Sequence, residues 1–275
     1  MHRGALPNGI WLTVSGRPIA ELRMLVAAGG RMLLRHGNRD VLLARVDDNR
    51  YGVTVRRLPG WRSPVPPIRA DVARAFGPDL TRWAHWFADH LRAPLHDGEW
   101  VLQSRVLPPY VLAGDLVREF PAAYLDWFVS GWNGAVPLRR LSEPTSGSVK
   151  AYRKLEVLPP VLLWHQSGLD GYLVLDGHDR LIAAAVEQVQ VPILILARAE
   201  DIRWLQTATA EHEAAIDLID IQVAAGLSGA NRLRDKNIRQ FARMAASVGD
   251  ELGRTMGWQL PGGVVEWDRI AAAVQ

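Results

Sequence analysis

Residues 176–180 read Asp-Gly-His-Asp-Arg and stand between an apolar, strand-like segment and an alanine-rich, helix-forming one. A strand that runs directly into a helix points the free amides of the first helical turn beyond its own end. Those amides and the helix dipole favour an anion. Gly177 leaves room for a phosphate to approach, and His178 and Arg180 can donate hydrogen bonds to it. The types and order of these residues therefore predict a phosphate-binding turn.

A purely structural interpretation of the same turn is open as well. Asp176 can cap the following helix, and Arg180 stands four residues later, where it can form an exposed ion pair with Asp176. The spacing fits both interpretations, so the elements around the turn have to be considered.

Those elements alternate between strands and short helices. Residues 191–198 form an apolar run that reads as a strand buried on both faces, and an earlier strand is entered through Pro159 and Pro160. This alternation predicts an α/β unit. Its expected elements are strand 136–141, helix 149–156, a strand within 157–166, a turn at 168–171, strand 172–176, helix 178–188 and strand 191–198.

Residues 136 to about 198 resemble the core of the ParB/sulfiredoxin-like superfamily. In that superfamily two prolines, an apolar strand, a turn, a second strand, a Gly-x-x-Arg motif, a helix and a third strand follow one another. The free-serine kinases among its members carry an Asp-Gly-His-His-Arg version, which is similar to the Asp-Gly-His-Asp-Arg of this chain. The resemblance implies a nucleotide-binding fold and an ATP- or ADP-dependent phosphotransferase that acts on a small hydroxyl-bearing metabolite.

The resemblance also implies roles for individual residues. Gly177, His178 and Arg180 match the positions that contact nucleotide phosphates. Asp176 matches the carboxylate that lies near the transferred phosphoryl group, where it would hold Mg²⁺ or the acceptor hydroxyl. Asp179 replaces the second histidine of the kinases and adds negative charge beside the phosphate site, which would either weaken nucleotide binding or recruit Mg²⁺.

Two further residues are candidates by position. In the kinases a glutamate from the region of the first strand is the proposed base, and Glu143 is a better match than Glu156, although a loop carboxylate is often just a solvated surface residue. His165 ends the strand that follows Pro160, so we expect it at the same end of the sheet as the turn, within reach of a ligand. The sulfiredoxin cysteine has no counterpart because the chain contains no cysteine, which excludes reduction of cysteine-sulfinic acid.

Two other functions stay open beside the kinase. The similarity to partition proteins of the same superfamily implies a DNA-associated regulator that uses CTP as a switch. The other alternative is a non-catalytic interaction scaffold. Basic residues concentrate between 232 and 243, but we expect them to lie all round their helix, so nucleic acid is not the favoured partner. These residues are Arg232, Arg234, Lys236, Arg239 and Arg243.

Around the predicted core, covering 131–200, the sequence divides into an N-terminal mixed α+β region of unknown role, 1–130, and a helical C-terminal region, 201–275. Together they predict an α/β (α+β) fold. Short apolar runs between turn residues over 23–58 predict an antiparallel meander. Other expected elements are a proline-rich connector at 60–68, a helix over 71–91 broken at Gly77 and Pro78, a strand at 100–107, one or two short helices at 114–130, and helices at 209–226, 230–256 and 264–274.

The composition is that of a folded protein. The 275 residues are 48% hydrophobic and 22% charged, and the net charge of +3 is too small to indicate nucleic acid. No signal-peptide pattern and no apolar run of 18 residues is visible, so we expect a cytoplasmic protein without a membrane partner. Two remaining groups are more simply explained as solvated helix faces than as sites. They are His85, Asp89 and His90, with His96 as a possible further metal ligand, and Glu213, Asp217 and Asp220.

Overall fold

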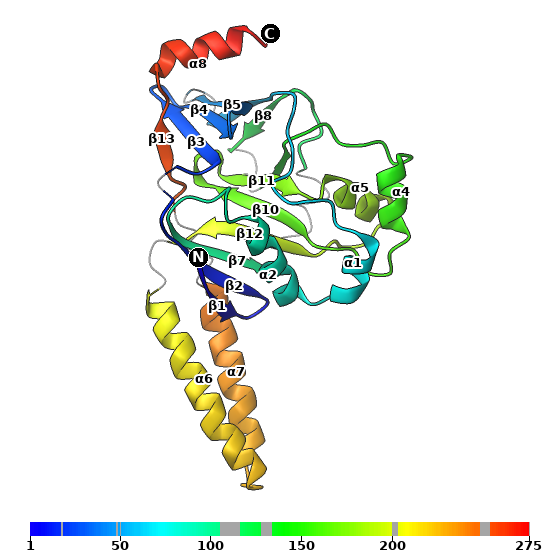
Figure 1. The fold of residues 1–275 in the computed structure, drawn as a ribbon, viewed down its shortest axis with the longest axis vertical. Coiled ribbons are helices and arrows are strands. Elements are labelled where there is room, and N and C mark those ends of the chain that lie inside the picture. The colour runs from blue at the N-terminus through cyan, green and yellow to red at the C-terminus, as the bar shows by residue number, and fades with distance from the viewer. Residues whose placement is uncertain are drawn as a thin grey trace.

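Two mixed β-sheets build the body of the molecule in the computed structural model, which gives the chain an α+β fold (Figure 1). The first sheet has the order β1 (His2–Leu6), β2 (Gly9–Val14), β7 (Gly98–Ser104), β12 (Ile193–Arg198), β10 (Val161–Gln166), β11 (Gly171–Asp176) and β9 (Ala135–Pro137). The second has the order β13 (Gly257–Gln259), β3 (Leu22–Ala27), β4 (Arg31–His36), β5 (Arg39–Asp47), β6 (Gly52–Arg57) and β8 (Ala122–Asp126). The structure describes residues 1–17, 19–47, 49, 51–104, 116–127, 134–199, 203–247 and 254–274.

The predicted α/β unit is confirmed in the first sheet. Strand β10 pairs in parallel with β12 and antiparallel with β11, while helices α4 (Gly147–Arg153) and α5 (His178–Glu187) lie in the connections. Strand β12 is buried over Ile193–Ala197, as its continuous apolar pattern predicts.

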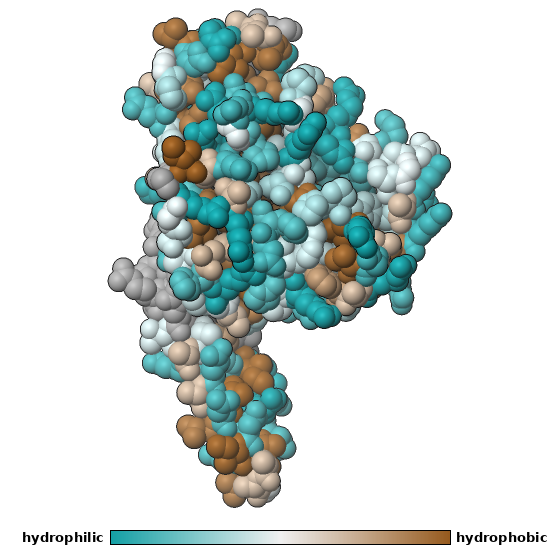
Figure 2. Space-filling view, viewed as in Figure 1, coloured by the Kyte–Doolittle hydropathy of each residue, from teal (hydrophilic) through white to brown (hydrophobic). Residues whose placement is uncertain are grey.

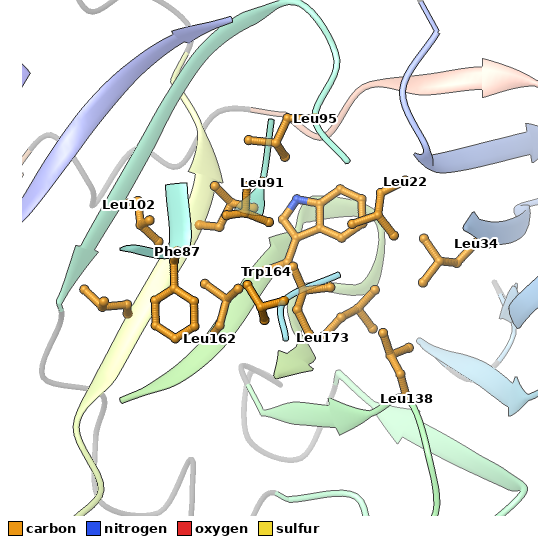
Figure 3. Close-up of a cluster of buried hydrophobic side chains, with 14 of the residues drawn as sticks. Leu22, Leu34, Phe87, Leu91, Leu95, Leu102, Leu138, Leu162, Trp164 and Leu173 are labelled. Atoms are coloured by element: carbon orange, nitrogen blue, oxygen red, sulfur yellow. The ribbon is translucent and has the colours of Figure 1, made fainter. Parts of the chain in front are cut away.

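The predicted boundary near residue 130 does not separate two structural units. Strands β1, β2 and β7 extend the same sheet as β9 to β12, because β7 pairs with both β2 and β12. Figure 3 shows a shared core in which Leu22 and Leu34 of the second sheet lie near Leu162, Trp164 and Leu173 of the first. Each large apolar side chain buried there contributes about 1.5 to 3 kcal/mol. The two sheets therefore stabilise one another.

The predicted meander is confirmed as strands β3 to β6, which are consecutive and antiparallel. The expected interruption at Gly77 is confirmed too, since helix α1 (Ala70–Phe76) ends there and α2 (Leu80–His90) begins after Asp79. The carboxylate of Asp79 accepts a hydrogen bond from the amide of Arg82 and so caps α2. Between the meander and α1, residues 61–69 form neither helix nor strand, as the prolines predict.

The predicted helices at 114–130 are wrong in the part that the structure describes, 116–127. Strand β8 pairs antiparallel with β6, and Leu125 is buried while Tyr124 on the other side of the strand is exposed. Aromatic and apolar residues suit such a half-buried strand as well as a helix, and the free edge of β6 decides between them. Residues 114, 115 and 128–130 lie outside the described part.

The helical C-terminal region forms a projecting hairpin and a returning segment. Helices α6 (Arg203–Ala224) and α7 (Ala230–Ser247) pack against each other and extend away from the sheets, with hydrophobic side chains on the surface of the hairpin (Figures 1 and 2). The end of the helix predicted for 230–256 is wrong in its described part, because residues 254–256 form neither helix nor strand. Strand β13 follows them and pairs with β3, and helix α8 (Gly263–Ala272) packs on the second sheet through Ile270, which belongs to the same apolar cluster as Leu260. Among the described residues, no helix is both long and apolar enough to cross a membrane.

Candidate functional site

The turn at 176–180 joins strand β11 to helix α5, as the sequence predicts. Asp176 ends the strand and Gly177 is the N-cap residue, with a φ of 99°. The predicted capping by Asp176 is wrong, because the helix has no side-chain cap and the Asp176 carboxylate turns to Arg180 instead. Leu181 is the first residue whose amide bonds back to Gly177, so the amides of the first helical turn are not used by the helix itself.

Gly177 has a local structural reason. A β-carbon at this position would lie 2.9 Å from Nη2 of Arg180 and 3.0 Å from the side chain of Val161, in a backbone conformation that L-residues rarely adopt. Its missing side chain therefore accommodates Arg180 and strand β10. The expectation that glycine makes room for a phosphate is not needed to explain the residue.

Arg180 is a buried residue, with 2% of its side chain exposed. Its Nη2 donates hydrogen bonds to Asp176 Oδ2 (2.6 Å) and to the carbonyl of Pro160 (3.0 Å), and its guanidinium lies 5.5 Å from the ring centre of Tyr152. The i, i+4 pair is confirmed, but the prediction that it is exposed is wrong. Arg180 links β11 and α5 to the start of β10 and to α4, and its buried Nε has no hydrogen-bond partner among the described residues.

His178 is buried as well and is held by the backbone. The amide of Leu138 donates a 3.1 Å hydrogen bond to Nε2 of the imidazole. Burial lowers the pKa of His178 to about 3, Arg139 and Arg180 act in the same direction, and Asp179 opposes them. The ring is therefore neutral near pH 7 and carries its proton on Nδ1, the tautomer that this contact requires. Its Nε2 cannot donate to a phosphate in this arrangement.

Asp179 is tied to the segment that follows β9. Its Oδ1 accepts hydrogen bonds from Nη2 of Arg139 and from the hydroxyl of Ser142, both at 2.7 Å. Burial raises the pKa of this carboxyl, but hydrogen bonds from Ser142, Arg139 and Ser148 outweigh it and hold the pKa below its usual range. Asp179 is therefore an ionised partner of Arg139, and the other carboxylate of the turn, Asp176, accepts a hydrogen bond from Arg180.

A cavity of about 380 Å³ opens over this turn. One wall is the start of α5 and the other is the proline-rich connector, so residues more than 100 positions apart meet. Three arginines and two carboxylates contribute to the lining, which leaves an excess of positive charge because His178 is neutral. The lining residues are Trp61, Arg62, Ser63, Val65, Pro67, Arg139, Tyr152 and residues 176–180.

The contribution of the connector was missed in the sequence, as were Arg139 and Tyr152. Arg62 is exposed, whereas Trp61 and Val65 are buried. Prolines fix the connector in an extended form, and apolar residues between them are the signal that it packs against something. That signal does not indicate which element it faces.

The other predicted site residues lie elsewhere. His165 faces Tyr172 across the β10–β11 pair, with ring centres 5.7 Å apart, whereas Asp176 lies opposite Leu162. Because the two strands are antiparallel, His165 is about 13 Å along the sheet from the turn, and the prediction that it shares the turn's end is wrong. Glu143 is exposed and lines a second cavity, apart from Asp176. Glu156 is exposed in the loop after α4 and lines neither cavity.

No metal centre is apparent in the described part of the chain, which contains no group of three or more histidines and carboxylates that could hold an ion. Asp89 pairs with Arg3, and His90 packs on Trp86 in helix α2. His96 is buried against Trp100, and its Nδ1 contacts the carbonyl of Asp97 at 2.7 Å. An ion that is held mainly by bound phosphates would need only one or two carboxylates, here Asp176 and Asp179.

From the sequence we expect the basic residues of α7 to lie all round the helix, and this expectation is wrong. Arg234 turns toward α6 and pairs with Asp220 (2.6 Å). Arg232, Lys236 and Arg239 follow at spacings of four and three, are exposed, and therefore share the outer face. Three cations on one face supply few phosphate contacts. Glu213 and Asp217 are exposed on α6, and the side chain of Arg243 lies outside the described residues.

Comparison of the chain with family models, with curated proteins and with solved structures gave no match.

Proposed function

We propose that the cavity over the start of α5 binds the phosphate groups of a nucleotide, ATP or ADP, with CTP as the alternative ligand. The observation that carries the proposal is the uncapped start of α5, which opens into a cavity with Arg62, Arg139 and Arg180 in its lining. Amides of a first helical turn and arginines are the donors that phosphate groups prefer. The volume of about 380 Å³ lies in the range of small-molecule sites.

Within this proposal the three arginines have different tasks. Arg62 is exposed at the cavity and can turn toward a phosphate without breaking any contact that the structure describes. Arg139 forms an ion pair with Asp179, so it stabilises the wall of the cavity and adds to the positive charge of the lining. Arg180 is buried in its contacts with Asp176 and Pro160, so it positions the turn and adds positive potential instead of gripping the ligand by its Nη2.

Phosphoryl transfer receives less support than binding. Both carboxylates of the turn are engaged by arginines, and Glu143 lines the other cavity, so no described carboxylate is placed as a free base beside Asp176. For a Mg²⁺ nucleotide, Asp176 or Asp179 would have to exchange an arginine for the ion. We therefore propose nucleotide binding as the function, with phosphotransferase activity on a hydroxyl-bearing metabolite as a second activity that a turnover assay tests.

The test is calorimetric titration with ATP, ADP and CTP, each with and without Mg²⁺. The informative variant is Arg62→Gln, because Arg62 is exposed and its loss leaves the turn intact. Removing a charge-assisted contact is expected to weaken nucleotide binding by about 1.5 to 3 kcal/mol, which is roughly a ten- to 150-fold loss. The matched control is Arg232→Gln, an exposed arginine on the outer face of α7, which should bind as the wild type does.

Binding of ATP or ADP would favour the kinase-like function, and binding of CTP the regulator. If no nucleotide binds, or if Arg62→Gln and Arg232→Gln bind equally well, the cavity is not a nucleotide site and the turn is only a strand-to-helix junction.

A further inference from the structure

A second cavity, of about 510 Å³, lies beside a later part of α5. It shares a wall with the first cavity, the segment 139–144. Ser142 lines the second cavity while its hydroxyl bonds to Asp179, which lines the first. The second cavity is a separate space with its own chemistry.

One side of this cavity is apolar. Ile182, Ala185 and Val186 follow at spacings of three and one on α5, which places them on neighbouring positions of one helix face, and Leu141 adds a further aliphatic side chain. Val186 is 37% exposed at the cavity, whereas Ile182 beside it is 5% exposed. This side can take up the hydrocarbon part of a small molecule.

The other side is cationic. Arg118 and Arg140 line the cavity and are exposed, and neither forms an ion pair with a described carboxylate. The guanidinium of Arg140 lies 5.0 Å from the ring centre of Phe120, also in the lining. Phe120 thus holds one arginine at the cavity by a cation–π contact and leaves its N–H groups for another partner.

A buried arginine next to Phe120 adds to the positive electrostatic potential of this side of the cavity. Arg57, only 2% exposed, lies 5.0 Å from the same Phe120 ring and donates to the carbonyl of Pro121. No described carboxylate forms an ion pair with it, although Glu119 attracts it from beyond ion-pair distance, and its Nη2 has no partner among the described residues. A desolvated charge without a counter-ion in direct contact is costly, and a further anion nearby offsets part of that cost.

We propose that the second cavity binds a small organic acid with a single carboxylate and an apolar body. Arg140 and Arg118 receive the carboxylate, for which the arginine fork has matching geometry, and the apolar side of α5 receives the body. Glu143 at the same cavity disfavours a doubly charged anion such as a phosphate ester, since it repels the additional charge. This site is independent of the proposed nucleotide site.

The test uses sodium hexanoate and sodium phenylacetate as probes, with hexanamide as the neutral counterpart of the first. Protein with labelled Ile and Val methyl groups reports binding by NMR at Ile182 and Val186. We expect saturable shifts at these methyl groups with at least one of the two acids, and at least tenfold weaker binding of hexanamide than of hexanoate if hexanoate binds. Arg140→Gln should weaken binding of the acid at least tenfold, since it removes the charge but keeps a polar side chain of similar length.

The control variant Arg62→Gln separates the two proposals, because it changes the first cavity only. It should bind the acid as the wild type does, whatever its affinity for nucleotide. The proposal is overturned if neither acid gives saturable shifts at Ile182 and Val186, if acid and amide bind equally, or if Arg140→Gln has no effect on an acid that binds.

Discussion

The loss of stability that we expect for Arg180→Ala differs strongly between the sequence and the structure. From the sequence, the Asp176–Arg180 pair is an exposed i, i+4 pair whose loss should cost well under 1 kcal/mol. In the structure the guanidinium is buried, it bonds to Asp176 (2.6 Å) and to the Pro160 carbonyl (3.0 Å), and it stacks near Tyr152. Arg180→Ala removes the guanidinium from its contacts with Asp176, Pro160 and Tyr152.

The expected magnitude follows from the burial of the two partners. Breaking a buried ion pair by removing one member costs about 3 to 5 kcal/mol. The Asp176 side chain is 15% exposed, so water can solvate part of the carboxylate that is left behind. We therefore expect the lower end, about 3 kcal/mol of unfolding free energy, which is roughly a hundredfold change in the unfolding equilibrium constant.

Urea denaturation followed by tryptophan fluorescence measures this loss, provided that the dependence on urea keeps its slope. The double variant Asp176→Ala with Arg180→Ala should lose less than the sum of the two single variants, with a coupling of about 1 to 3 kcal/mol. Arg180→Lys should fall between wild type and Arg180→Ala, because it keeps a charge for Asp176 but not the planar fork.

The matched control is the pair Arg69–Asp71, which is exposed on both sides. Arg69→Ala should leave the stability unchanged. If Arg180→Ala costs less than about 1 kcal/mol, or no more than Arg69→Ala, then Arg180 is not the buried link between β11, α4 and β10 that we describe.

Three further predictions concern the same turn. Acidification from pH 7 to pH 5 should cost the wild type about 2 kcal/mol through His178, because unfolded histidine takes up a proton below pH 6.5 while the folded residue, with a pKa of about 3, does not. The contribution of neutral His178 to the unfolding free energy is complete above pH 6.5 and is lost as the pH falls below that value. Urea titrations of His178→Gln at the two pH values should lack this loss. Gly177→Ala should lower the unfolding free energy by about 1 to 3 kcal/mol in thermal or urea unfolding, because its β-carbon would meet Arg180 and Val161 at a φ of 99°; a neutral outcome would contradict the close approach. Asp179→Asn should bind nucleotide several-fold more tightly in calorimetry, because it removes negative charge beside the cavity and releases Arg139, and weaker binding would argue for a carboxylate-held Mg²⁺.

The alternation of elements in the α/β unit was readable from the sequence alone. Hydrophobic periodicity is a local property, so strands β10, β11 and β12 and helix α5 were predicted in order and close to their observed bounds. The meander over 23–58 and the break at Gly77 followed in the same way from turn residues. Helical geometry also fixed the partner of Arg180, because a residue four positions later lies one turn along the same face.

Strand pairing and direction required the tertiary structure. Residues 122–126 have a composition that suits a strand or a helix, and only the open edge of β6 makes them a strand. His165 was placed at the wrong end of the sheet because the direction of β10 relative to β11 depends on how the chain returns, which the local pattern of β10 does not contain.

The candidate site depended most on the tertiary structure. The sequence identified Asp176, Gly177, His178, Asp179 and Arg180 as one group, and the structure keeps them together. Whether a side chain is a solvated donor or a buried support depends on which distant segments exclude water from it. Here segments around 61–67, 138–142 and 152–160 cover the turn, so Arg180 becomes a buried link and His178 a neutral acceptor, while a cavity forms that no local pattern could predict.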